Sequence, residues 1–592
     1  MLDLKRVAIV GSGPTALYLL KHIANSASDF CKQITSIDVF EQDSRLGMGM
    51  PYSPRTTDHH NMCNISSKEL PALETPFAAW LRSQDQATLR EFGLSRDDIN
   101  EDDTYSRLAM GQYFAAQFRA IVARLESAGI KMVEHAECRV VDIQVDPLQE
   151  TYTVIADPNL EAEFDTIVIA SGHQFDARDE PASGYYTSPW PIQKLLPADG
   201  QKLAFKIGTL GASLSAFDVI SSLAHRHGTF QARAGGGGKM IDYIPDDGCE
   251  ALQFVMHSAE GWLPHLQYEQ EEPFRELYRH VSQEDLESLR DESGFLRLDT
   301  YFHEVCRPAL IEAFQRDGRD DMASQLSQPD FGIEQFAEQM TSEHEYEDAF
   351  DGMRLELPAA RRSVQEDFPI HWKEVFDDLM YALNFHADWM PAEDHIRFQS
   401  CVMPFLLNVI AAMPLRAARM LLALRTAGML QLVPGYAKVV SLEDGLTTVQ
   451  VEGDGGNSTH QYRMFVDCTG QGSLQIEQFP FPSLVESGTV RPARAPFADS
   501  SSPGKLPEHE NSRVSVDDGR PHYQTGGIDV DNCYRLINVD GLANSHAYDV
   551  AFPHTTGVRP YSYGLQACEL TARLVVSSWM GKESSCTADS LT

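Results

Sequence analysis

The stretch KRVAIVGSGPTALYLL, residues 5–20, decides the fold of this chain. Its apolar run predicts a buried parallel strand, and the run ends at a Gly-x-Gly step directly before an apolar helix. Gly11 allows a tight turn, and Gly13 lets the backbone approach a pyrophosphate at the positive end of the helix. Ala16 replaces the usual third glycine and is small enough for close packing. The stretch predicts a dinucleotide-binding loop, although an ordinary strand-to-helix turn can have the same pattern.

An acid follows the next strand-like run, ITSIDVFE at 34–41. Glu41, at the carboxyl end of this run, can accept hydrogen bonds from both hydroxyls of an adenosine ribose. The alternative is a loop acid in solvent. Because the acid ends a predicted strand, we favour the ribose contact.

A second strand–loop–helix pattern, LAFKIGTLGASLSAFD, occupies residues 203–218. Its loop reads Gly211-x-Ser213-x-Ser215, so a small residue stands where a phosphate would approach. A structural turn without a ligand is the competing interpretation. Two further runs, FDTIVIASGH at 164–173 and RMFVDCTGQG at 463–472, end in small residues, as expected where a sheet edge meets a cofactor.

Composition excludes several classes of protein. The chain has 592 residues, of which 43% are hydrophobic and 23% charged, typical of a soluble globular protein. A net charge of −38 argues against a nucleic-acid partner, because such proteins need clustered Lys and Arg. The longest apolar run, 402–415, contains Pro404 and Pro414 and is too short to span a bilayer, so we predict no membrane segment.

The cysteines and the first residues indicate a cytoplasmic protein. Ten cysteines are scattered without a C-x-x-C pair, which favours reduced thiols over disulfides. The start MLDLKR runs directly into a strand and lacks the features of a signal peptide. His59, His60 and Cys63 have no second ligand cluster of matching spacing, so we predict no metal site.

The predicted fold class is α/β, with two Rossmann-like dinucleotide-binding domains and a mainly helical insertion. The expected boundaries are 1–195 for the first part of the first dinucleotide-binding domain, 196–266 for the second dinucleotide-binding domain, 267–430 for the helical insertion, and 431–592 for the second part of the first domain with a C-terminal helix.

These motifs resemble those of two-dinucleotide flavoproteins. The resemblance rests on GSGPTA at 11–16, the acid at 41, IASG at 169–172 and GASLSAFD at 211–218. More narrowly, GMGMPY at 47–52, Asn64 and GWLP at 261–264 are similar to bacterial FAD/NAD(P)-binding proteins related to flavin-dependent N-hydroxylating monooxygenases. The resemblance covers roughly residues 5–270 and 430–580.

The resemblance implies two cofactor sites. The residues implied for FAD are Gly11, Gly13, Pro14, Thr15, Ala16, Glu41, Gly47, Met48, Gly49, Ser171 and Gly172. Those implied for NADH or NADPH are Gly211, Ser213 and Ser215. Relatives that use NADPH often place an Arg after the next strand, whereas this chain has Glu260, which would repel a 2′-phosphate. We therefore favour NADH slightly over NADPH.

The implied activity is an FAD-dependent, NAD(P)H-using monooxygenase that oxygenates a small molecule, an amine among the candidates, with molecular oxygen through a peroxyflavin. One alternative is an FAD-dependent oxidase or dehydrogenase with a vestigial nicotinamide domain. The other is a non-catalytic flavin-binding redox sensor or scaffold. The sequence makes no prediction of oligomeric state.

Four residues are candidates for catalysis. Asn64 could face the flavin ring, as the resemblance implies, or cap a turn. His173 and His554 could assist chemistry, although a structural role is common for such histidines. Arg559 could hold a substrate carboxylate or the flavin pyrophosphate, or form a surface ion pair. The insertion could form a substrate lid, with a pocket or a core built from Trp372, Phe385 and Trp389.

Overall fold

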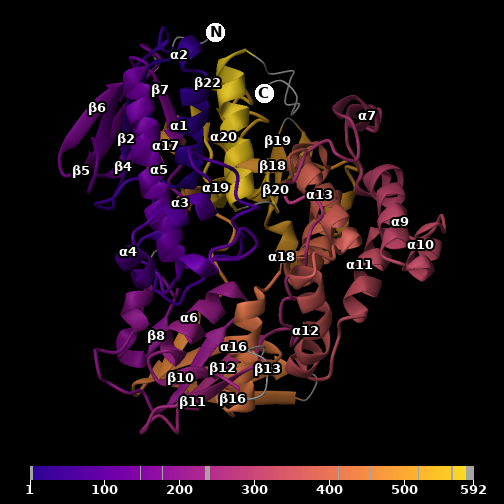
Figure 1. Ribbon diagram of the computed structural model, residues 1–592. Coiled ribbons are helices and arrows are strands. Elements are labelled where there is room, and N and C mark those ends of the chain that lie inside the picture. Colours follow the sequence, from indigo (N-terminus) through magenta and orange to yellow (C-terminus); the bar gives the residue numbers. More distant parts are fainter. Residues whose placement is uncertain are drawn as a thin grey trace.

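The computed structural model describes residues 4–146, 148–175, 178–233, 240–410, 412–453, 456–517, 519–561 and 564–581. Figure 1 shows three parts: a sheet with helices at the top, a second sheet with helices at the bottom, and a helical part beside them. The mixed α/β class with two largely parallel sheets and a helical region is as predicted.

The first sheet has the strand order β21-β22-β7-β1-β2-β3. These strands are β1 (Lys5–Val10), β2 (Ile34–Phe40), β3 (Lys131–His135), β7 (Thr166–Ile169), β21 (Arg535–Ile537) and β22 (Ala543–Asp549). All neighbours are parallel except β21 and β22. Val7, Ala8 and Ile9 of the central strand have no exposed surface, as is typical of a parallel strand inside a sheet.

Three helices border this sheet: α1 (Pro14–Asn25), α5 (Arg107–Ser127) and α20 (Leu565–Trp579). Helix α1 packs against both α5 and α20, so the two ends of the chain meet there (Figure 1). An antiparallel sheet follows β3, made of β4 (Arg139–Asp146), β5 (Thr151–Asp157) and β6 (Leu160–Phe164). Its first two strands, β4 and β5, form an antiparallel hairpin.

The second sheet has the order β13-β12-β9-β17-β8. Its strands are β8 (Tyr185–Tyr186), β9 (Lys206–Leu210), β12 (Gln253–Ser258), β13 (Leu430–Pro434) and β17 (Met464–Asp467). All four pairings are parallel. The sheet is flanked by α6 (Leu214–Ala224), α16 (Leu415–Thr426) and the hairpin of β10 (Gly228–Ala232) and β11 (Ile241–Pro245).

The sheets divide the chain differently from the expected boundaries. Residues 431–592 were expected to complete the first domain, but β17 pairs with β9 of the second sheet. A further antiparallel sheet of β14 (Tyr436–Glu443), β15 (Leu446–Gly453) and β16 (Gly456–Tyr462) precedes β17. Strand β8, from the range expected in the first domain, also joins β17. These segments belong to the second sheet because they pair with strands far away in the sequence. Local sequence does not specify such pairing.

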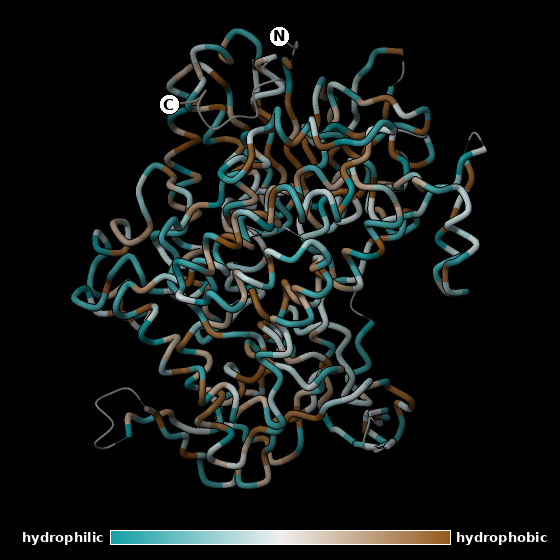
Figure 2. Tube along the Cα trace, turned by 90° about the vertical axis from the view of Figure 1, so that its right-hand side faces the viewer, coloured by the Kyte–Doolittle hydropathy of each residue, from teal (hydrophilic) through white to brown (hydrophobic). Residues whose placement is uncertain are grey.

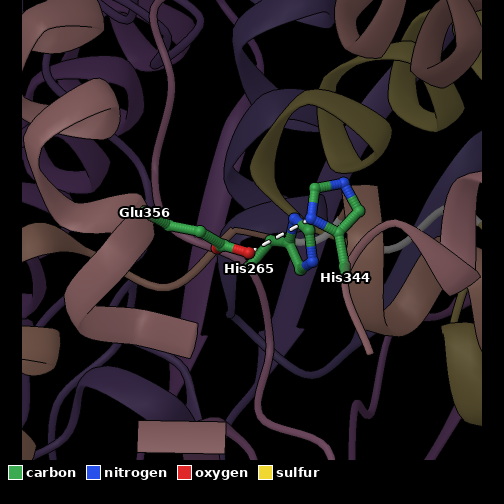
Figure 3. Close-up of side chains that lie close together, drawn as sticks. All are labelled: His265, His344 and Glu356. Carbon is green, nitrogen blue, oxygen red and sulfur yellow. Dashed lines mark hydrogen bonds and ion pairs between the residues drawn. The ribbon is translucent and has the colours of Figure 1, made fainter. Parts of the chain in front are cut away.

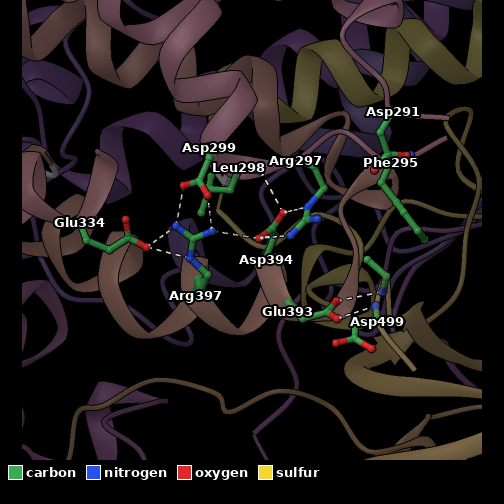
Figure 4. Close-up of polar contacts among 11 residues, drawn as sticks. Asp291, Phe295, Arg297, Leu298, Asp299, Glu334, Glu393, Asp394, Arg397 and Asp499 are labelled. Atoms are coloured by element: carbon green, nitrogen blue, oxygen red, sulfur yellow. Dashed lines mark hydrogen bonds and ion pairs between the residues drawn. The ribbon is translucent and has the colours of Figure 1, made fainter. Parts of the chain in front are cut away.

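The helical part contains α7 (Gln283–Ser288), α8 (Leu298–Tyr301), α9 (Arg307–Arg316), α10 (Asp320–Leu326), α11 (Ile333–Ser342), α12 (Ala349–Gln365), α13 (His371–Asn384), α14 (Ala392–Arg397) and α15 (Met403–Phe405). It has its own apolar core, in which the ring of Trp372 stacks on Phe314 with centroids 5.4 Å apart. Helix α14 is tied to this part by a network of charges (Figure 4).

Figure 4 also shows how the helical part contacts the C-terminal segment. The carboxylate of Glu393 accepts hydrogen bonds from the backbone N–H groups of Ala498 and Asp499, both at 3.0 Å. These residues follow β18 (Pro492–Pro496), which pairs with β20 (Arg520–Ile528) next to β19 (Val514–Asp517). The helical part is therefore held on a small antiparallel sheet.

Hydropathy follows this architecture. Figure 2 shows apolar segments gathered inside the upper part, whereas most outer loops are hydrophilic. Among the described helices, none is both long and apolar enough to cross a bilayer.

The nine cysteines within the described residues are all free thiols. The predicted C-terminal helix begins at Leu565, and its expected first residue, Ser562, lies outside the described residues.

Candidate functional site

The carboxyl ends of β1, β7 and β22 meet at one edge of the first sheet. Gly11 ends β1 with a φ of +99°, and a Cβ there would lie 2.4 Å from the carbonyl oxygen of Ala170. The loop after β1 is therefore pressed against the end of β7. On the other side of β7, the N–H of Val550 donates to the carbonyl of Ile169 at 2.8 Å, which adds the end of β22.

The GMG loop lies on the start of helix α1. A Cβ at Gly49 would be 2.9 Å from Cδ of Pro14 and 3.1 Å from Cα of Gly13. Gly47, with a φ of +90°, fits against Phe118 of α5. Met48 and Ala16 are almost completely buried, and Thr15 is partly exposed in the first turn of α1. The structure thus brings together the residues implied for FAD from two separate loops.

Glu41 is oriented by the first loop. Its Oε2 accepts hydrogen bonds from the Oγ of Ser12 at 2.6 Å and from the Ser12 N–H at 3.2 Å. Its Oε1 accepts from the N–H of Asp43 at 2.9 Å. Each carboxylate oxygen can accept more than one hydrogen bond, so Oε1 keeps capacity for a ribose hydroxyl. Glu41 is partly buried, contrary to a loop acid free in solvent.

The edge fits the phosphate group of a dinucleotide. No side chain caps the N-terminus of α1, so its first N–H groups are available to an anion. The Oγ of Ser171 is buried without a hydrogen-bond partner. Gly172, with a φ of +68°, faces open space, since a Cβ there would meet nothing within 4 Å. An uncapped helix, an unpartnered hydroxyl and open space at one edge are what bound FAD would need.

A buried His–Asp pair lies at the end of β22. The Nδ1 of His554 is 2.7 Å from Oδ2 of Asp549, and both side chains are almost fully buried. Burial raises the pKa of Asp549. His173, after β7, contacts Gln471 at 3.2 Å. Burial lowers the pKa of His173, and the nearby His554 lowers it further. Two of the predicted histidines therefore lie at the same edge of the sheet.

Arg559 is buried rather than part of a surface ion pair. Its Nη1 lies 3.1 Å from Asp388 of the helical part, and its Nη2 donates to Asn532 at 3.2 Å. The guanidinium lies over the rings of Phe385 and Tyr534. Its Nε has no hydrogen-bond partner. Arg559 thus joins the helical part to the first unit and retains one unused donor.

The second loop repeats the geometry of the first. Gly211 ends β9 with a φ of +100°, and a Cβ there would lie 3.3 Å from the backbone of Cys468, at the end of β17. Ser213 caps α6 by position but makes no cap hydrogen bond, and Ser215 lies in its first turn. Glu260 is exposed in the turn after β12. The start of α6 thus has the same uncapped N–H groups as α1.

Asn64 lines a pocket between the two units, away from the other catalytic candidates. The pocket has a volume of about 260 Å³ and lies between the segment 59–64, helix α6 and the start of α16. Sequence reasoning missed its arginines, Arg107, Arg416 and Arg419. The closely spaced Arg416 and Arg419, directly after the apolar run 402–415 of an acidic chain, were the available signal.

The aromatic residues of the insertion do not line this pocket. Trp372 is packed in the core of the helical part, and Phe385 packs against Tyr381. Trp389 lies against the His386 ring and under the Arg290 guanidinium. The core interpretation therefore holds for Trp372 and Phe385, and the pocket is built from other residues.

A cluster of metal-ligand residues lies beside the insertion. His265, His344 and Glu356 have ligand atoms within 4.8 Å of one another (Figure 3). His344 Nδ1 lies 3.1 Å from Glu356, and Lys373 Nζ lies 3.1 Å from His265 Nδ1. Burial lowers the pKa of Lys373 to about 8, so near neutral pH an ammonium already faces this cluster. The polar groups of the cluster are thus paired with one another and with Lys373. The Lys373 ammonium would repel a metal cation.

Residues 8–174 match the family described as FAD-NAD(P)-binding, and residues 282–410 match the YdhS-like middle domain. The first match confirms the predicted resemblance to FAD/NAD(P)-binding proteins. The uncharacterized protein YdhS of Escherichia coli (strain K12) is 26% identical over 486 residues, covering 82% of this chain and 86% of that protein.

Three solved structures are similar in fold. Ornithine hydroxylase PvdA from Pseudomonas aeruginosa has a TM-score of 0.47 at 10% identity, covering 98% of this chain and 100% of that one. Ornithine N-hydroxylase KtzI from Kutzneria sp. 744 has a TM-score of 0.42 at 13% identity, covering 98% and 99%. The bacillithiol disulfide reductase Bdr from Staphylococcus aureus has a TM-score of 0.41 at 9% identity, covering 98% and 100%. Likenesses at this level assign no activity.

Proposed function

We propose that this protein is an FAD-dependent oxidoreductase that uses NAD(P)H and acts as a monooxygenase on a small molecule. The observation that carries the proposal is the FAD-NAD(P)-binding match over residues 8–174, the part that forms most of the sheet edge described above. A second β–loop–α unit with the same uncapped helix start supports a nicotinamide partner. The more specific part of the proposal is that the enzyme is a monooxygenase and not an oxidase.

The first loop would bind FAD. The N–H groups at the start of α1 would donate to the pyrophosphate, and Glu41, held by Ser12, would accept from the ribose hydroxyls. The hydroxyl of Ser171 would donate a hydrogen bond that it lacks within the protein. Bound FAD would supply the redox chemistry, so the chain needs only to position its reactants and exclude water.

The second loop would bind the nicotinamide nucleotide. Gly211 leaves space for the phosphates, and Ser213 and Ser215 can donate hydroxyl hydrogen bonds at the start of α6. Glu260 carries a negative charge in the turn where a 2′-phosphate would lie, which favours NADH over NADPH.

His554 would move a proton. Its contact with Asp549 favours the tautomer with a proton on Nδ1, which leaves Nε2 free to accept a proton near the sheet edge. His173, neutral because of burial, would act beside it as a hydrogen-bonding group. Arg559 would position this edge through its links to Asp388 and Asn532. Asn64 would contribute its side-chain amide from the wall of the 260 Å³ pocket beside α6.

Stopped-flow spectroscopy tests the proposal. The purified full chain should show flavin absorption, and NADH should bleach it in the absence of oxygen faster than NADPH does. A Gly211→Val variant is the control, because it should retain flavin and lose the bleaching. Hydrogen peroxide formed in place of an oxygenated product would indicate an oxidase. Flavin that neither nucleotide bleaches would contradict the nicotinamide route and favour a sensor or scaffold.

A further inference from the structure

The pocket of about 260 Å³ runs along the flank of helix α6. Leu214, Phe217, Ser221 and His225 line it from the first turn of α6 to its last. Dinucleotide phosphates bind across the N-terminus of such a helix instead. A volume slightly below the ~300 Å³ at which typical ligand pockets begin suits a small metabolite and not a whole dinucleotide. The pocket thus reaches the second proposed nucleotide loop only at Leu214 and extends away from it along α6.

Three arginines line this pocket. Arg107 is compensated, because its Nη2 lies 2.7 Å from Oδ2 of the buried Asp218. Arg416 and Arg419 form no hydrogen bond or ion pair with any residue that the structure describes. In a chain with a net charge of −38, two arginines without a hydrogen-bonded carboxylate partner are a local surplus of positive charge.

Both arginines lie where a helix disfavours them. They occupy the first turns of α16, and the positive end of the helix dipole repels cations placed there. Burial and the like charges of Arg361 and Arg416 lower the pKa of Arg419, and the charge of Asp103 opposes this shift. A bound anion would relieve this repulsion and accept the unused N–H donors.

The pocket lining also includes flat, uncharged rings. The rings of His60 and His225 stack with centroids 3.8 Å apart at 7°. Burial and the neighbouring His225 lower the pKa of His60 to about 4, so its ring is neutral at pH 7. Phe217 and Phe230 add apolar surface. A ligand that fills the pocket therefore meets both guanidinium groups and uncharged rings.

We propose that this pocket binds a small organic anion, whose carboxylate or phosphate is held by Arg416 and Arg419 and whose flat, apolar body packs against Phe217 and Phe230. The inference does not depend on the proposed redox activity, because it concerns equilibrium binding of an anion and not reduction of a flavin.

Isothermal titration of the full chain with benzoate, phenyl phosphate and neutral benzyl alcohol tests this. We expect saturable binding of one equivalent of an aromatic anion and no binding of benzyl alcohol. Whichever of benzoate and phenyl phosphate binds with the higher affinity shows whether the site prefers a carboxylate or a phosphate. Arg416→Gln and Arg419→Gln should each weaken binding by about tenfold or more. The exposed Arg362→Gln on α12 is the matched control and should bind like the wild type.

Thermal melting separates a binding role from a structural one. If both arginines serve binding, each glutamine variant should melt at the same temperature as the unliganded wild type or higher, because repulsion is removed. Lower melting temperatures with unchanged anion binding would overturn the proposal. So would equal binding of benzyl alcohol, or failure of both aromatic anions to bind.

Discussion

At the scale of single residues, the glycines of the sheet edge differ in what surrounds them. A Cβ at Gly11 would meet the Ala170 carbonyl, whereas a Cβ at Gly172 would meet nothing. We expect Gly11→Ala to lower the free energy of unfolding by about 2–3 kcal/mol, because a clash is added to an unfavourable φ. Gly172→Ala should cost less stability but reduce retained flavin. Urea unfolding and absorbance measure the two effects. Equal stability loss in both variants would contradict this account.

Asp218 makes stability depend on pH. Burial raises its pKa to about 6, despite the nearby Arg107, so the folded state binds this proton more tightly than the unfolded state. The contribution of Asp218 to stability is therefore largest below pH 4 and falls as the pH rises to above 6. Relative to Asp218→Asn, the wild type should lose about 1–2 kcal/mol between pH 5 and 7.5, measured by urea unfolding. A constant difference across this range would refute the raised pKa.

At the scale of elements, α14 depends on Arg397. Its guanidinium contacts Asp299, Glu334 and the buried Asp394, the last of which also binds Arg297 (Figure 4). Arg397→Gln leaves Asp394 with one arginine, and should destabilise the helical part by about 1–3 kcal/mol.

Hydrogen–deuterium exchange measures this effect. Amides of α8, α11 and α14 should exchange faster in Arg397→Gln, while β1 and β2 keep their protection. Arg354→Gln, which removes an exposed pair with Asp351 within α12, is the control and should change little. Faster exchange throughout the chain would show global instead of local destabilisation.

Local sequence predicts elements better than it predicts their neighbours. The strand, loop and helix at β1–α1 and at β9–α6 follow from short patterns, and both are confirmed. The place of β17 could not be predicted in this way, because its partner β9 lies more than 200 residues earlier. Similarly, the pocket beside α6 exists only because α16 packs there, so the close spacing of Arg416 and Arg419 in the sequence could not show which element they would face.

At the scale of the whole molecule, the net charge of −38 opposes the approach of an anionic nucleotide. The second-order rate of flavin reduction by NADH should therefore rise several-fold between about 0.01 and 0.15 M ionic strength, because screening weakens the repulsion. Reduced nicotinamide riboside carries no phosphate and is the control, which should show little dependence on salt. A rate for NADH that falls with salt would indicate local attraction stronger than the overall repulsion.

In both sheets, neighbouring strands lie far apart in the sequence. This arrangement affects how the chain folds during translation. Strand β9 lacks one neighbour until β17, at residues 464–467, has been synthesised. Strand β7 likewise lacks one neighbour until β22, at residues 543–549, has been synthesised. During synthesis on the ribosome, both sheets therefore carry an open parallel edge until most of the chain has emerged. Open edges recruit other chains. A nascent chain released before residue 464 exposes both, so completion of the two sheets requires nearly complete translation.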